Sequence, residues 1–134
     1  MCSRILLVVV LLTPIAYFTA GLGSIEALAA PKSSNPLSGD EAAIRDGKSL
    51  FRGICAVCHG RNADGKGERG QGADLRKFKR GFTRYLEITQ NGQDTGRTQK
   101  MPAWGKVLPE EDLIKIGAFL ETLAIEGANW VDPE

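Results

Sequence analysis

The sequence predicts an all-α fold with three main helices around one small core. Three segments, near residues 39–54, 82–91 and 109–123, place apolar residues at the three- and four-residue spacing of an amphipathic helix. After residue 30, no segment alternates apolar and polar residues as a half-buried strand would. The length of 134 residues, with 43% hydrophobic and 25% charged residues, suits one domain. A second sizeable core is not expected.

The N-terminus has the pattern of a secretory signal peptide over residues 1–29. Arg4 precedes an apolar run at 5–12, and Ala27-Leu28-Ala29 fits a small-residue cleavage site. The alternative is an uncleaved membrane anchor, but the run is short against the roughly 20 residues that span a bilayer. We therefore predict cleavage after Ala29, export to the periplasm, no membrane span after cleavage, and a flexible segment over residues 30–37.

The first helix is expected to start near Gly39, because Ser38 and Glu41 fit a capping box. Its apolar stripe consists of Ile44, Gly47, Phe51 and Ile54.

The middle helix is expected from about Phe82 to Asn91, with Gly92 as a left-handed stop. Its inward residues are Tyr85, Leu86 and Ile88. The last helix is expected to begin with Pro109 at the first helical position, followed by three carboxylates at the positive end of the dipole. Its apolar face consists of Leu113, Ile116, Leu120 and Leu123, with Phe119 beside them.

The sequence Cys55-Ala56-Val57-Cys58-His59 is the part of the chain that carries chemistry. A structural zinc site needs four nitrogen or sulfur ligands, but only two cysteines and one histidine remain after cleavage. A thioredoxin-like pair belongs in a strand-helix-strand unit, which is not predicted here. A plain disulfide remains the alternative, although it leaves His59 unexplained. Cys-x-x-Cys-His is the signature of covalent haem attachment.

The spacing of this motif has a physical reason. Residues three and four apart share one face of a helical turn, so Cys55 and Cys58 can form thioethers with the two vinyl groups of one porphyrin. His59 then becomes the proximal axial ligand of the iron. We predict one haem c per chain.

Met101 is the candidate distal axial ligand. Pro102 biases Met101 toward an extended conformation, as in a loop that arches over a haem face. A thioether is a soft ligand, and His/Met ligation raises the potential of a carrier cytochrome. The alternative is a methionine that only fills the core, but no second histidine exists for the sixth position.

From Ser38 to Leu123 the chain resembles the class I cytochromes c. Besides the haem motif, Met101-Pro102-Ala103-Trp104-Gly105 lies where that family places its methionine ligand. The resemblance implies a cytochrome c fold wrapped around one haem, with Gly47, Phe51 and Phe119 at the crossing of the terminal helices. It divides the chain into a cytochrome c domain at 38–124 and a C-terminal tail at 125–134.

One short segment departs from the family pattern. Gly72-Ala73-Asp74-Leu75 stands where many relatives have Gly-Pro-x-Leu, whose proline-position carbonyl accepts the Nδ1 proton of the proximal histidine. We expect the carbonyl of Ala73 to take this role for His59.

Ligand counting predicts an electron-transfer protein and not an enzyme. With His59 and Met101 on the iron, no site is open for a substrate, so the available chemistry is one-electron transfer at the haem edge. We expect a monomeric carrier between a dehydrogenase and a terminal oxidase or another cytochrome. The alternative is a haem subunit held permanently in a multi-subunit periplasmic oxidoreductase.

Charge is distributed unevenly along the chain. Residues 61–106 contain eleven basic and five acidic residues, whereas residues 107–134 contain seven acidic residues and Lys115 as the single basic one. A basic surface around the haem edge would steer an acidic partner onto it. The run from Arg76 to Arg84 interleaves basic and aromatic residues, but export and a net charge of +1 argue against nucleic acid. We expect Phe78 and Phe82 to face the haem instead.

A finer resemblance concerns the partner. The loop Met101–Gly105 and the tail segment Ala128-Asn129-Trp130 resemble those of cytochromes that accept electrons from quinoprotein (PQQ-dependent) alcohol dehydrogenases. This resemblance implies such a dehydrogenase as the electron donor.

Overall fold

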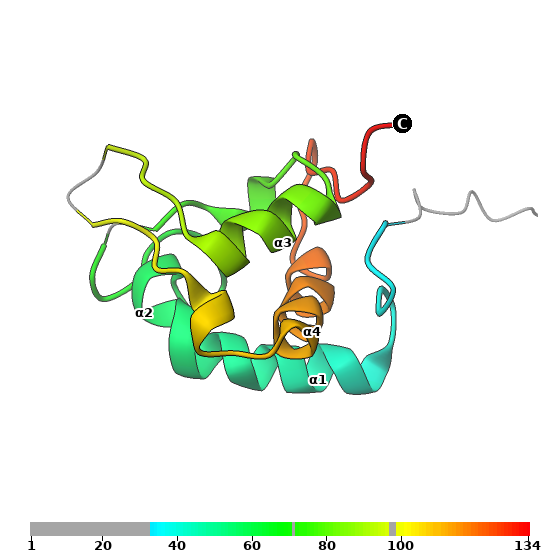
Figure 1. Ribbon diagram of the computed structural model, residues 1–134, viewed down its shortest axis with the longest axis horizontal. Coiled ribbons are helices and arrows are strands. Elements are labelled where there is room, and N and C mark those ends of the chain that lie inside the picture. The colour runs from blue at the N-terminus through cyan, green and yellow to red at the C-terminus, as the bar shows by residue number, and fades with distance from the viewer. Residues whose placement is uncertain (1–32, 71, 97–98) are drawn as a thin grey trace, which may run out of the picture.

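The computed structural model of the chain describes residues 33–134, except 71 and 97–98 (Figure 1). The predicted signal peptide and its cleavage site lie outside these residues. The longer helices are α1 (Glu41–Leu50), α3 (Phe82–Asn91) and α4 (Glu110–Glu121). A π-helical turn (Phe51–Cys55) joins α1 to the short α2 (Ala56–His59), and two 3₁₀ turns cover Leu75–Lys77 and Trp104–Lys106. The described residues contain no strand, which confirms the all-α prediction.

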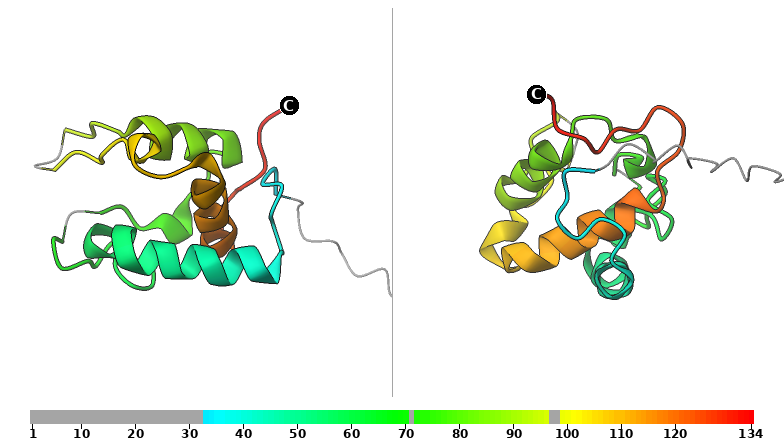
Figure 2. Two further views of the ribbon diagram at one scale, coloured as in Figure 1. Left: turned by 60° about the horizontal axis from the view of Figure 1, so that its bottom comes forward. Right: turned by 90° about the vertical axis from the view of Figure 1, so that its right-hand side faces the viewer.

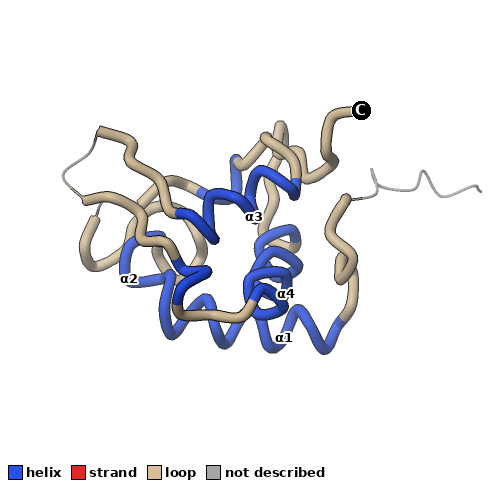
Figure 3. Tube along the Cα trace, viewed as in Figure 1, coloured by secondary structure: helices blue, strands red, loops and turns tan. Residues whose placement is uncertain are grey.

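Long loops separate the helices (Figure 3). α1 and α3 run on opposite sides of the molecule, and α4 stands between them at one end (Figure 2). Among the described residues, no helix has both the length and the apolar character needed to cross a membrane.

The crossing of α1 and α4 forms one end of the core. Gly47 allows the close approach, because a Cβ at this position would overlap the carbonyl oxygen of Lys115. Phe51 is fully buried, and its ring packs against Phe119 with centroids 5.5 Å apart. The predicted meeting of Gly47, Phe51 and Phe119 is therefore confirmed.

The predicted capping box at Ser38 is wrong. α1 begins at Glu41, and Asp40 is its N-cap, because Asp40 Oδ1 accepts a hydrogen bond of 2.8 Å from the amide of Ala43. The hydroxyl of Ser38 instead donates to Glu121 Oε2 at 2.5 Å. Gly39, with φ of +78°, separates Ser38 from the helix. A carboxylate next to the first turn supplies the cap and also favours the positive end of the helix.

Two other predicted helix ends need small corrections. Pro109 is the N-cap of α4 and not its first helical residue, since the helix begins at Glu110. Gly92 ends α3 with the positive φ of 75° that favours glycine, but its ψ of 176° lies outside the left-handed helical region. A side chain at Gly92 would meet the carbonyl oxygen of Met101 at 2.5 Å, so the loop from Met101 packs directly on this end of α3.

The bounds of α3 are as predicted, but its inward face differs in part. Tyr85 is buried, whereas Leu86 and Ile88 are half-buried. Thr89 is buried as well and was not anticipated; its hydroxyl donates to the carbonyls of Tyr85 and Leu86, both at 3.0 Å. Phe82 is buried but stacks on Tyr85, with centroids 6.0 Å apart.

Both described ends of the chain pack against the domain. In the segment predicted to be flexible, Asn35 is only 4% exposed and donates from Nδ2 to the carbonyl of Ile114 at 3.2 Å. In the tail, the amide of Asn129 donates to the carbonyl of Phe78 at 2.8 Å. The packed unit therefore extends beyond residues 38–124 at both ends.

Candidate functional site

An apolar cavity of about 50 Å³ lies between the helices and is partly open to solvent. Cys55, His59 and Met101, three of the four predicted site residues, line it. Cys58 is half-buried beside them but does not line the cavity. Phe78 lines the cavity as predicted, whereas Phe82 does not.

The π-helical turn leads directly into the cysteine motif. The amide of Ala56 donates to the carbonyl of Phe51, five residues earlier. Single π-helical turns occur frequently at functional sites. Gly60 ends α2 with φ of 78°, so the chain turns away immediately after His59.

The sulfurs of Cys55 and Cys58 are not joined in a disulfide. Burial, with a smaller contribution from neighbouring Cys58, raises the pKa of Cys55 to about 12. Its thiol is therefore un-ionised at neutral pH. Redox-active cysteine pairs depend on a lowered thiol pKa, so this environment disfavours the thioredoxin-like alternative.

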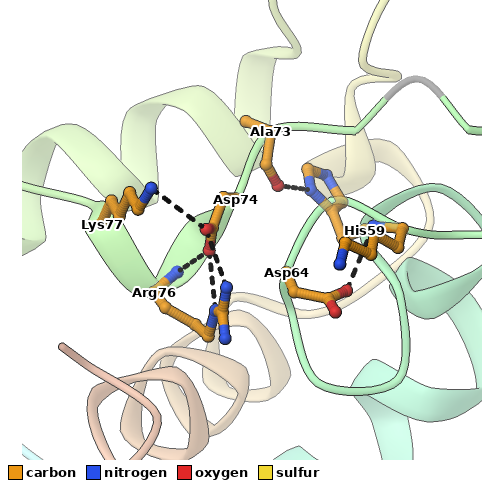
Figure 4. A network of polar contacts seen from close by, with 7 residues as sticks. His59, Asp64, Ala73, Asp74, Arg76 and Lys77 are labelled. Atoms are coloured by element: carbon orange, nitrogen blue, oxygen red, sulfur yellow. Dashed lines mark hydrogen bonds and ion pairs between the residues drawn. The ribbon is translucent and has the colours of Figure 1, made fainter.

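His59 is fixed by a hydrogen bond of 2.9 Å between its Nδ1 and the carbonyl oxygen of Ala73 (Figure 4). A carbonyl can only accept, so Nδ1 carries the proton and Nε2 keeps its lone pair for a metal. Burial lowers the pKa of His59, and the hydrogen bond to Ala73 opposes this effect in part. The predicted role of the Ala73 carbonyl as the acceptor is confirmed.

The loop that carries Ala73 is held by its own contacts. The amide of Leu75 donates to the carbonyl of Ala63 at 2.8 Å, and that of Gly72 to the carbonyl of Cys58 at 3.1 Å. Arg76 binds the carboxylate of Asp74 through two hydrogen bonds of 2.9 Å, and these bonds lower the pKa of Asp74 (Figure 4). The acceptor for His59 is thus placed by the backbone and by this ion pair.

Met101 is fixed by an isolated antiparallel bridge to Gln93. The amide of Gln93 donates to the carbonyl of Met101 at 3.1 Å, and the amide of Met101 donates back at 2.9 Å. Gln93 follows Gly92, the C-cap residue of α3, so the end of this helix positions the methionine. The half-buried side chain of Met101 lines the same cavity as His59.

A family model described as cytochrome c oxidase, cbb3-type, subunit III matches residues 42–120, more than half of the chain. The chain belongs to this cytochrome c family. Membership implies a covalently bound haem c with its iron, and electron transfer instead of enzymatic turnover. Cys55 and Cys58 both lie within the matched residues.

A crystal structure of cytochrome CL from the marine methylotrophic bacterium Methylophaga aminisulfidivorans MPT has a similar fold. The TM-score is 0.54 and the sequence identity 21%, over 75% of this chain and 72% of that one. This likeness confirms the cytochrome c fold predicted from the sequence.

The residues of the cavity fit a haem. Apolar side chains form most of its wall and suit a macrocycle, while the neutral imidazole of His59 and the thioether of Met101 suit iron. When bound, the haem supplies a one-electron couple at its iron. Within this cytochrome, the chain positions the imidazole through Ala73 and the thioether through Gln93.

Two residues that line the cavity, Thr89 and Trp130, were not predicted from the sequence to do so. Thr89 is polar and lies in the last turn of α3, where its own bonds to the helix backbone make burial tolerable. Trp130 belongs to the tail, and the finer resemblance to dehydrogenase-linked cytochromes was the one signal that pointed to this segment.

Proposed function

We propose that the protein is a periplasmic one-electron carrier in which His59 and Met101 are the axial ligands of the haem iron. The observation that carries the proposal is that both side chains line one cavity, each held by backbone hydrogen bonds. Two protein ligands leave no coordination position for a substrate. The protein accepts and passes on single electrons, and rigid ligands keep the structural change between redox states small.

The proposed donor is a periplasmic quinoprotein alcohol dehydrogenase, and the proposed acceptor is a terminal oxidase or another cytochrome. The resemblance of the Met101–Gly105 loop and of the tail supports the donor. The charge of residues 61–106, here called the basic segment, supports docking, because most of its basic side chains are solvent-exposed. These are Arg61, Lys66, Arg69, Lys77, Lys79, Arg80, Arg84, Lys100 and Lys106. An acidic face on the dehydrogenase would therefore be attracted to these basic side chains.

The test is to mix reduced quinoprotein dehydrogenase with the oxidised cytochrome and to follow haem reduction as ionic strength rises. We expect fast reduction that slows with salt, and slower, less salt-dependent reduction in Lys79→Glu. Lys48→Glu, an exposed substitution in α1 outside the basic segment, makes the same charge change and is the control. If the haem is not reduced, the proposed donor is wrong. If it is reduced at a rate that does not depend on salt, the donor is supported but the electrostatic steering is contradicted.

A second candidate function is a haem subunit held permanently in a multi-subunit oxidoreductase. The observation that favours it is the description of the matching family, which names an oxidase subunit. Gentle fractionation of the native, untagged protein separates the two candidates. A free monomer supports the carrier, and constant co-migration with one larger complex supports the subunit.

A further inference from the structure

The carbonyl that orients His59 lies on an exposed residue. Ala73 is solvent-exposed and its side chain is a single methyl group, so side-chain packing does not fix its position. Proline, which many class I cytochromes have here, restricts the backbone, whereas alanine does not. The hydrogen bond of 2.9 Å from His59 Nδ1 to this carbonyl therefore depends on what holds the neighbouring residues.

Asp74 shares a peptide plane with that carbonyl. The peptide group that joins Ala73 to Asp74 is planar, so the direction of the Ala73 C=O follows the placement of Asp74. The guanidinium of Arg76 holds the Asp74 carboxylate by two hydrogen bonds of 2.9 Å, from Nε to Oδ1 and from Nη2 to Oδ2 (Figure 4). A two-bond contact of this kind fixes geometry more closely than a single ion pair does.

Arg76 is itself tied to two other parts of the chain. Its amide donates to Asp74 Oδ1 at 3.2 Å, at the start of the 3₁₀ turn Leu75–Lys77. Its carbonyl accepts from the amide of Ile125 at 3.0 Å, in the segment that follows α4. Arg76 therefore connects the loop next to His59 to a segment that is distant in the sequence.

We propose that Arg76 is a positioning residue for the proximal ligand of the haem. By holding Asp74 it fixes the Ala73 carbonyl, and so it sets the strength of the hydrogen bond from His59 Nδ1. An acceptor on Nδ1 makes the imidazole a stronger donor to the iron, and a stronger donor favours the ferric state. Weakening this bond should therefore raise the reduction potential. The inference rests on the proposed ligation of the haem iron by His59.

The first test is NMR of the reduced, untagged holoprotein labelled with ¹⁵N-histidine. The chain has one histidine, so the Nδ1 signal needs no further assignment. In Arg76→Met we expect the Nδ1 proton to move upfield and to exchange with solvent about fivefold faster, the factor that corresponds to the loss of one ordinary hydrogen bond. Lys77→Met is the matched control, because Lys77 Nζ lies 3.8 Å from Asp74 Oδ2 and carries the same charge on the same turn. Its Nδ1 signal should match the wild type.

Backbone amides distinguish positioning from general stability. If the amides of α1 and α4 exchange faster to the same extent as Nδ1 in Arg76→Met, the residue only stabilises the fold and the proposal is overturned. An unchanged Nδ1 signal in Arg76→Met overturns it as well. The wild type tests the ligand separately, because the ring protons of an axial histidine are shifted strongly upfield by the haem. Absence of that shift would contradict ligation by His59.

The second test is the reduction potential of a variant that keeps the charge. Arg76→Lys retains the positive charge but loses the two-bond contact, so the potential should rise. Lys77→Arg, the reverse exchange in the same turn, should leave the potential unchanged. The rise should be smaller in Ala73→Pro/Arg76→Lys, because proline restricts the loop without help from Asp74. An unchanged or lower potential in Arg76→Lys, or an equal rise in the double variant, would overturn the proposal. If Arg76→Met does not retain haem, Arg76→Lys serves for both measurements.

Discussion

His59 and Ala73 are joined by a hydrogen bond of 2.9 Å from imidazole Nδ1 to the backbone carbonyl, although Ala73 stands where many class I cytochromes have proline. The contact uses a main-chain oxygen, so it depends on where the loop runs and not on the side chain. The hydrogen bond from the amide of Leu75 to the carbonyl of Ala63 and the Asp74–Arg76 ion pair fix this loop, a role that the proline ring has in those relatives.

Replacing Ala73 by proline should therefore stabilise the protein without altering His59 as the haem ligand. The amide of Ala73 donates no hydrogen bond to the described residues, so Ala73→Pro should raise the free energy of unfolding by about 0.4–1 kcal/mol through the unfolded chain. Denaturant titration measures this. Ala63→Pro is the contrasting variant, because Ala63 has φ of 57° and donates to the carbonyl of Gly60 at 3.0 Å. A loss of stability in Ala73→Pro would mean that the loop cannot adopt the angle proline requires.

Removing the Met101 thioether should open the sixth position of the iron. In Met101→Ala we expect a lower reduction potential, loss of the thioether-to-iron charge-transfer band, and binding of carbon monoxide to the reduced protein. Lys100→Ala alters the neighbouring residue, which is exposed and pairs with Asp94, and should leave all three properties unchanged. A Met101→Ala spectrum and potential identical to those of the wild type would assign the methionine to the core alone.

A side chain at Gly47 should separate the two terminal helices. A Cβ there overlaps the Lys115 carbonyl, so Gly47→Ala should reduce the free energy of unfolding by about 1–3 kcal/mol or more. Gly53→Ala is the matched control, because a Cβ at Gly53 meets nothing within 4 Å. Thermal unfolding of both holoproteins measures the difference. Equal melting temperatures would show that the helices do not cross at Gly47.

Asp132 caps α3 from a distance of 49 residues along the chain. Its Oδ1 accepts from the amide of Thr83 at 2.8 Å and its Oδ2 from the Thr83 hydroxyl at 2.7 Å, since the N-cap residue Gly81 has no side chain. Asp132→Ala should lower the free energy of unfolding by about 1 kcal/mol at neutral pH, as the loss of other helix caps does. Glu134→Gln, at an exposed position two residues on, should have little effect.

The cost of Asp132→Ala should also depend on pH. Burial acts to raise the pKa of Asp132, but hydrogen bonds from Thr83, Ser34 and Phe82 outweigh it, so the pKa is lowered in the folded protein. A carboxyl with a lowered folded pKa stabilises the fold above its ordinary pKa and loses this effect as pH falls through the folded value. The difference between wild type and Asp132→Ala should therefore shrink in acid. A difference that grows as pH falls would rule out the charged cap.

Features encoded by local patterns could be predicted from the sequence. The helical spacing of apolar residues located α3, and the resemblance to class I cytochromes c placed Gly47 and Phe119 at the helix crossing. The haem motif and the dipeptide Met101-Pro102 pointed to Cys55, His59 and Met101, which line the cavity. The π-helical turn carries no such signal, because its residues have ordinary helix-compatible identities. Contacts between segments that are distant in the sequence could not be predicted either. The Asp132 cap and the Ser38–Glu121 hydrogen bond correspond to no periodic pattern in the sequence. Trp130 in the wall is a third example, since only the folded tail brings it there.

The most direct test of the haem assignment is an absorption spectrum of the purified holoprotein in both redox states, together with its intact mass. We predict the mass of the processed chain plus one haem that acid-acetone does not extract, and a thioether-to-iron charge-transfer band in the oxidised protein. An extractable haem, or an oxidised spectrum without that band, would contradict covalent attachment through Cys55 and Cys58 or ligation by Met101, respectively.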